Sequence, residues 1–102
     1  MCGIFGCISN IGSFIDKTDL NTLANHARQR GRDSSGLIFE KDNVYKVSRA
    51  DNDILRLISN VKPYNSSFVM GHSRLITNGL SDNQPVLRND ILVIHNGIIV
   101  ND

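Results

Sequence analysis

The chain opens with an apolar run that glycine interrupts twice, and no other stretch limits its fold as strongly. Residues 2–9 read Cys-Gly-Ile-Phe-Gly-Cys-Ile-Ser. A run of this kind is typical of a strand that is buried on both faces. Its glycines indicate that another backbone or a ligand comes close to the strand. We therefore expect the fold to be organised around this opening strand.

Apolar spacing divides the rest of the chain into short strands and two helices. Helical spacing predicts a helix over 16–28, capped by Asp16 or Thr18, and a second helix over 51–60. The expected strands are 37–39 and 44–47, joined as a hairpin through 41–43, then 67–71 and 91–94, with polar loops at 29–36 and 82–85. Short strands mixed with two amphipathic helices predict an α+β fold.

Length and composition exclude several classes of protein. The 102 residues suit one small domain. Lys and Arg number 11 against 10 Asp and Glu, which gives a net charge of +1 and argues against a nucleic-acid partner. No stretch is long enough to span a bilayer, so we expect no membrane partner. Two cysteines do not make a disulfide framework, and a reducing, cytoplasmic location follows.

Cys2 follows the initiator methionine directly. Removal of Met1 would leave Cys2 with a free α-amine, whose pKa of about 8 suits a base at neutral pH. A thiol beside that amine provides a nucleophile and a general base within one residue. The alternative is that Cys2 is simply a small apolar residue at the start of a buried strand.

Three polar clusters, at 30–36, 72–74 and 95–97, are separated by apolar strands. Their side chains can converge on Cys2 if the strands share one sheet. Each cluster also has an ordinary explanation, such as a surface ion pair for Arg74 or a hairpin turn at 95–97. The two histidines of the second and third clusters are not spaced as metal ligands, and we expect neither a metal nor another cofactor.

Together with Cys2, these clusters resemble the glutaminase domain of the class II glutamine amidotransferases, which are N-terminal nucleophile hydrolases. The segments that carry the resemblance are Cys2-Gly3-Ile4-Phe5-Gly6, Arg-Gly-Arg-Asp-Ser-Ser-Gly at 30–36, Gly-His-Ser-Arg-Leu-Ile-Thr-Asn-Gly at 71–79, Asn83-Gln84-Pro85, and His-Asn-Gly-Ile-Ile at 95–99. They occur in the family's order and extend over almost the whole chain.

The resemblance implies three catalytic residues. The thiolate of Cys2 would attack the side-chain amide of glutamine, form a thioester and release ammonia, with its own α-amine as the base. The side-chain N–H of Asn96 and the backbone N–H of Gly97 would form the oxyanion hole.

The resemblance also implies residues that bind glutamine or shape the site. Arg74 would hold the α-carboxylate of glutamine through its two-pronged guanidinium, and Thr77 would add a hydroxyl. Arg30 and Asp33 would shape the floor of the site around Cys2.

The resemblance implies a four-layer sandwich of two antiparallel sheets between helices, of which 1–102 would be the N-terminal half of a partial glutaminase domain. The expected partners are L-glutamine, an acceptor or synthase domain, fused or in a complex, and a second copy in a homo-oligomer. The resemblance is closest to the glutamine–fructose-6-phosphate amidotransferase type, with the asparagine synthetase type next and the amidophosphoribosyltransferase type third. A truncated module that binds glutamine without turnover is the alternative function.

Overall fold

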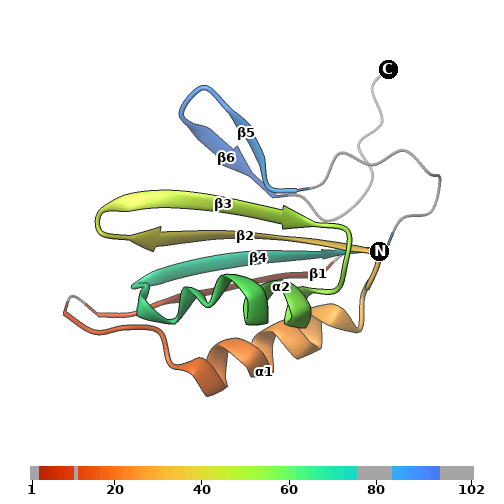
Figure 1. Cartoon of the computed structure of the whole chain (residues 1–102), viewed down its shortest axis with the longest axis horizontal. Coiled ribbons are helices and arrows are strands. Elements are labelled where there is room, and N and C mark those ends of the chain that lie inside the picture. The colour runs from red at the N-terminus through yellow and green to blue at the C-terminus, as the bar shows by residue number, and fades with distance from the viewer. Residues whose placement is uncertain (1–2, 11, 76–83, 95–102) are drawn as a thin grey trace.

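The structure is a computed structural model that describes residues 3–10, 12–75 and 84–94. Its main sheet has four strands in the order β1-β4-β2-β3, and every neighbouring pair is antiparallel (Figure 1). The bounds of its strands are Gly3–Ile8 for β1, Ser34–Lys41 for β2, Val44–Ala50 for β3 and Phe68–Arg74 for β4. The predicted α+β class and antiparallel pairing are confirmed.

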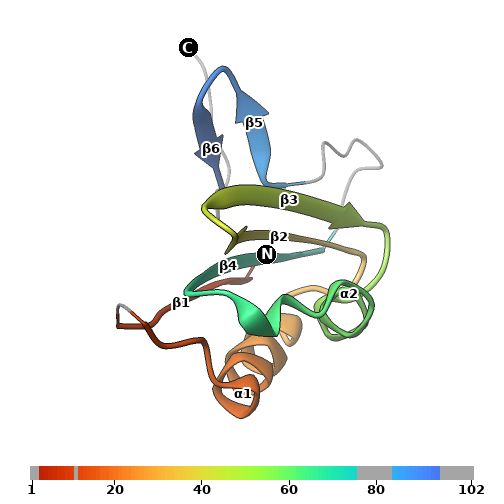
Figure 2. The same cartoon turned by 60° about the vertical axis from the view of Figure 1, so that its left-hand side comes forward.

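Two helices cover one face of this sheet, and a small hairpin lies on the other side of it (Figure 2). The helices are α1 (Lys17–Arg28) and α2 (Ile54–Val61), followed by the single 3₁₀ turn η1 (Pro63–Asn65), and the hairpin consists of β5 (Val86–Arg88) and β6 (Ile91–Val93). We call the sheet face that points away from the helices the outer face. It carries Ile4, Ile38 and Met70 and their alternating neighbours.

The core lies between the helices and the inner face of the sheet. Its buried side chains come from both helices and from β1, β2 and β4, and they include Leu20, Ala24, Ile54, Ile58, Phe5, Leu37 and Val69. These residues alternate along the strands and recur at helical spacing along α1 and α2, so the sequence pattern and the packing agree.

The prediction that the opening strand is buried on both faces is wrong for the described residues. β1 lies at the edge of the main sheet, and Ile4 and Ile8 on its outer face are 40% and 80% exposed. The helices cover only the face that carries Phe5. The expected close approach of another backbone is confirmed at Gly3, where a Cβ would lie 2.5 Å from the carbonyl oxygen of Ala27.

Of the two expected caps of α1, Asp16 is the one used, because its side chain accepts the backbone N–H of Asp19. Several element bounds differ from the prediction. β2 begins at Ser34, inside the expected loop 29–36, and β4 continues through Arg74 instead of ending at residue 71. β5 occupies 86–88, where no strand was expected.

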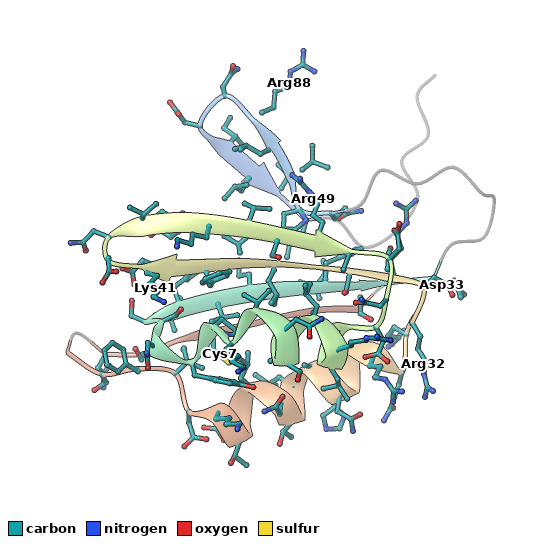
Figure 3. All side chains as sticks on the ribbon, viewed as in Figure 1. Cys7, Arg32, Asp33, Lys41, Arg49 and Arg88 are labelled. Carbon is teal, nitrogen blue, oxygen red and sulfur yellow. The ribbon has the colours of Figure 1, made fainter. Side chains whose placement is uncertain are left out.

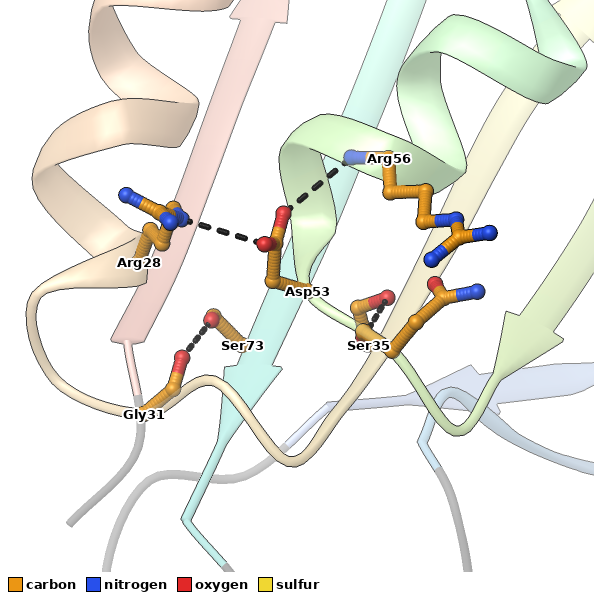
Figure 4. Close-up of polar contacts among 7 residues, drawn as sticks. Arg28, Gly31, Ser35, Asp53, Arg56 and Ser73 are labelled. Atoms are coloured by element: carbon orange, nitrogen blue, oxygen red, sulfur yellow. Dashed lines mark hydrogen bonds and ion pairs between the residues drawn. The ribbon is translucent and has the colours of Figure 1, made fainter.

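Asp53 caps α2 and joins it to α1. One of its carboxylate oxygens accepts the backbone N–H of Arg56 at 3.1 Å, and the other lies 3.3 Å from Nε of Arg28 (Figure 4). Partial burial alone would raise the pKa of Asp53, but the hydrogen bond from Arg56 and the Arg28 guanidinium outweigh it, so this pKa lies below its ordinary value.

Asp53→Ala is expected to lower the free energy of unfolding at pH 7 by about 1 kcal/mol, the usual cost of losing a cap. Because the pKa of Asp53 is lowered on folding, this contribution is complete above about pH 3.9 and is lost as the pH falls through the folded-state pKa. Urea unfolding of the wild type and the variant at pH 7 and at successively lower pH measures the difference. Asp53→Asn, which keeps a capping oxygen but no charge, is the control. A gap that stays constant with pH would contradict the role of the charge.

Candidate functional site

Three of the predicted motifs meet at one end of the main sheet. Gly3, at the start of β1, pairs with Ser73 near the end of β4, and Ser73 pairs in turn with Ser35 near the start of β2. In the next position, Arg74 pairs with Ser34. The condition that the strands share one sheet holds for β1, β2 and β4, whereas β6, which precedes the cluster at 95–97, belongs to the separate two-stranded sheet. The end of the main sheet brings three separate parts of the chain into contact.

The segment before β2 wraps tightly around the end of β4. The backbone N–H of Asp33 donates to the carbonyl oxygen of Arg74 at 2.9 Å, and the hydroxyl of Ser73 donates to the carbonyl oxygen of Gly31 (Figure 4). Gly31 is so close to β4 that a Cβ on it would overlap the backbone of Arg74 and Leu75. These contacts fix the backbone that carries the Arg74 side chain.

The other two site residues of this segment lie on either side of Gly31. Arg30 lines a groove of about 320 Å³ together with Gly3 and Ile4 of β1 and His26 of α1. Asp33 is exposed at the sheet end, beside Arg32 (Figure 3). Arg30 is thus next to the strand that begins one residue after Cys2, whereas Asp33 contacts the site through its backbone.

Two buried serines of this site were not singled out from the sequence. Ser35 and Ser73 are both 1% exposed or less, and they pair across β2 and β4. The hydroxyl of Ser35 donates to the carbonyl oxygen of Asn52 at 2.9 Å. This hydrogen bond connects the end of the sheet that carries the site to the loop before α2. Because β4 continues through Arg74, its period of two places Ser73 on the face opposite His72 and Arg74, but the strand predicted from the sequence ended at residue 71.

His72 lies on the outer face of β4, fully buried, with Gly36 and Ile4 as its partners on the two neighbouring strands. Arg74, two residues further on, is on the same face and half-buried. A half-buried guanidinium on the outer face, beside a buried histidine, can bind a carboxylate in a partly dehydrated setting.

The predicted residues Cys2, Thr77, Asn96 and Gly97 lie outside the described residues. The other cysteine, Cys7, is a free thiol at the far end of β1 from the site (Figure 3). Burial, assisted by the nearby Asp19 carboxylate, raises the pKa of the Cys7 thiol. Cys7 is therefore a poor nucleophile at neutral pH.

Among the described residues, no three His, Cys, Asp or Glu side chains gather in a way that could hold a metal ion. None of the helices in the described part of the chain is long and apolar enough to cross a bilayer.

The chain is similar over nearly its whole length to three curated proteins. Two are glutamine–fructose-6-phosphate aminotransferases (isomerizing): that of Wigglesworthia glossinidia brevipalpis is 36% identical over 115 residues, covering 99% of this chain, and that of Buchnera aphidicola is 33% identical over 111 residues, covering 100%. The third is the amidophosphoribosyltransferase of Mus musculus, 32% identical over 117 residues and 98% of the chain.

The chain spans 17% of the length of the two bacterial relatives and 22% of the mouse protein. No protein-family profile matches it, and no solved structure does. The three relatives are all class II glutamine amidotransferases, and they confirm the resemblance predicted from the sequence.

Proposed function

Because this chain is related to the class II glutamine amidotransferases, we propose that it hydrolyses glutamine to glutamate and ammonia and that the ammonia passes to an acceptor on a synthase domain. The register of β1, β4 and β2 carries this proposal. It pairs Gly3, the residue that follows Cys2, with Ser73 of the segment that contains Arg74, and Ser73 with Ser35 of the segment 30–36. Convergence of three motifs at one sheet end is what a common site requires.

In this proposal, Cys2 is the nucleophile once Met1 has been removed. The α-amine takes the proton of the thiol, and the sulfur attacks the amide carbon of glutamine. The amine then gives a proton to the departing nitrogen, so the carbon–nitrogen bond breaks and ammonia leaves a thioester on Cys2. Water attacks the thioester, which yields glutamate and restores the thiol.

The oxyanion that forms in each attack needs donors that are already in position. We assign these to the side-chain N–H of Asn96 and the backbone N–H of Gly97, as the family resemblance implies. Each such donor is typically worth about 2.7–4 kcal/mol of transition-state stabilisation.

Arg74 is proposed to bind the α-carboxylate of glutamine, with Thr77 as an additional hydroxyl donor. The hydrogen bond between Asp33 N–H and the Arg74 carbonyl supports this role, because it holds the backbone of Arg74 in place before substrate arrives. Arg30, which shares a groove with Gly3, and Asp33 are proposed to shape the floor of the site.

The domain is proposed to be the N-terminal part of a four-layer sandwich. Ile4 and Ile8 leave apolar surface exposed on the outer face, where a second sheet would pack, and the relatives are several times longer than this chain. We propose a sugar phosphate as the ammonia acceptor, since the two bacterial relatives are named for fructose 6-phosphate. The reaction would take place in the cytoplasm, where reducing conditions keep Cys2 a thiol.

The test is intact-mass analysis of the protein after exposure to a diazoketone analogue of glutamine. We expect a protein without Met1 that gains one adduct, mapped to Cys2, while Cys7 stays unmodified. Competing glutamine should slow the labelling, because the analogue and the substrate share one site. Aspartate at the same concentration is the control, and it should not protect.

Two results would contradict the proposal. If a folded protein without Met1 stays unlabelled, Cys2 is not a working nucleophile, and the remaining function is that of a module that binds glutamine without turnover. Labelling that glutamine does not slow would show a reactive thiol without a glutamine site.

A further inference from the structure

We infer that Arg49 and Gly36 are positioning residues of the glutamine site, because together they hold the segment Gln84–Pro85 against the outer face beside Arg74. This inference rests on the proposed function, and it assigns a task to two residues that have no part in the chemistry. Neither belongs to the set of residues that would touch glutamine.

The first component is the missing side chain of Gly36. A Cβ at this position would overlap the carbonyl oxygen of Gln84 and would lie 2.5 Å from Cδ of Pro85. Pro85 is one of the most deeply buried residues of the described chain. Only glycine therefore lets the Gln84–Pro85 backbone lie directly on β2.

The second component is Arg49, which lies on the edge strand β3 and pairs with Gly36 of β2. Its side chain donates the Nε–H to the carbonyl oxygen of Pro85 at 2.6 Å. A hydrogen bond from a charged donor is about twice as strong as one between neutral groups. Gly36 thus allows the Gln84–Pro85 segment to lie against β2, and Arg49 holds this segment there by a hydrogen bond.

This contact lies next to the proposed carboxylate-binding residue. Gly36 pairs with His72, and Ser34, two residues before Gly36 on β2, pairs with Arg74. Two residues along a strand span about 7 Å, so the held segment and Arg74 occupy neighbouring positions on one face. The deep burial of both Ser34 and His72 shows that the outer face is covered at this end.

The consequence concerns substrate binding more than bond breaking. The Arg49 hydrogen bond fixes the Gln84–Pro85 backbone on the outer face, two positions along β2 from Ser34, the partner of Arg74. A site whose walls are fixed beforehand loses less entropy when glutamine binds. Loss of the Arg49 contact should therefore raise the KM for glutamine and leave kcat almost unchanged.

The experiment measures the kinetics of glutamate release for the wild type, Arg49→Ala and Arg49→Lys. For Arg49→Ala we expect a KM about tenfold higher with kcat within twofold, and for Arg49→Lys, which keeps a charged donor, an intermediate KM. Lys46→Ala, which removes an exposed cation from the same strand, is the matched control and should match the wild type. The rate of Cys2 alkylation by iodoacetamide, a small neutral probe that needs no glutamine site, should be the same in all four proteins.

The outcomes separate this inference from the proposed function. If the wild type neither hydrolyses nor binds glutamine, the proposed function fails and the inference with it. If the wild type is active but Arg49→Ala keeps the wild-type KM, or loses kcat and stability at constant KM, the positioning role alone is overturned. If Lys46→Ala raises KM equally, the effect belongs to the charge of β3 and not to the Pro85 contact, which also overturns it.

Discussion

Cys2→Ala is expected to reduce glutamine hydrolysis by at least ~10³-fold, because the variant has no atom that can form the thioester. The α-amine remains in this variant, so the loss of activity measures the contribution of the thiol separately from that of the base. Glutamate release, measured with a coupled dehydrogenase, gives the rate, and circular dichroism verifies that the fold is retained.

Cys7→Ala is the matched control for this prediction. Cys7 is the other cysteine of the chain, at the opposite end of the same strand, and burial raises the pKa of its thiol. Its removal should leave the rate within about twofold and cost at most about 1 kcal/mol of stability, since the side chain is only partly buried. Retained activity in Cys2→Ala, or its loss in Cys7→Ala, would refute the assignment of the nucleophile.

The helices and the β2–β3 hairpin could be predicted because local signals decide them. Asp16 and Asp53 each accept a backbone N–H three residues further on, and apolar residues at helical spacing follow both caps. The turn between β2 and β3 uses Asp42 and Asn43 with φ of 54° and 63°, a conformation that these two residue types tolerate well. No distant contact is needed to specify these elements.

The ends of β2 and β4 could not be predicted, because polar residues form them. Ser35 and Ser73 are buried in the sheet, where each hydroxyl donates to a backbone carbonyl from another part of the chain. A pattern of polar residues predicts a loop, and only the tertiary partners turn it into a strand. The region where the prediction was wrong is also the candidate site. Side chains that serve a functional site often depart from the apolar pattern of an ordinary strand.

The contact between Arg49 and Pro85 shows a second limit of sequence reasoning. The two residues are 36 positions apart, and an arginine in an exposed strand resembles any other solvated charge. Gly36 ends the segment 30–36 that carries the family resemblance, but the sequence does not indicate which part of the chain approaches it. The outer face as a whole escapes prediction for the same reason, because the partners that cover a face are distant in sequence.

Gly31→Ala is expected to destabilise the protein by about 3 kcal/mol and to weaken glutamine binding at the same time. The new Cβ would overlap the backbone of Arg74 and Leu75, and no side-chain movement can relieve a clash with backbone. Forcing extra volume into a packed site costs about 1–3 kcal/mol, and loss of the hydrogen bond from Ser73 to the Gly31 carbonyl adds about 1 kcal/mol. Urea unfolding measures the stability, and the KM for glutamine measures the displacement of Arg74.

Gly6→Ala is the control that separates this clash from the general effect of replacing glycine. A Cβ on Gly6 would meet only the flexible side chain of Met70, at 3.4 Å, and the Val69 carbonyl oxygen, at 3.6 Å. Alanine at a compatible glycine position reduces the entropy of the unfolded chain, so this variant should lie within about 1 kcal/mol of the wild type. Equal losses in the two variants would mean that backbone flexibility, and not contact with β4, requires glycine at 31. A destabilised Gly31→Ala with unchanged KM would separate the packing of this segment from the placement of Arg74.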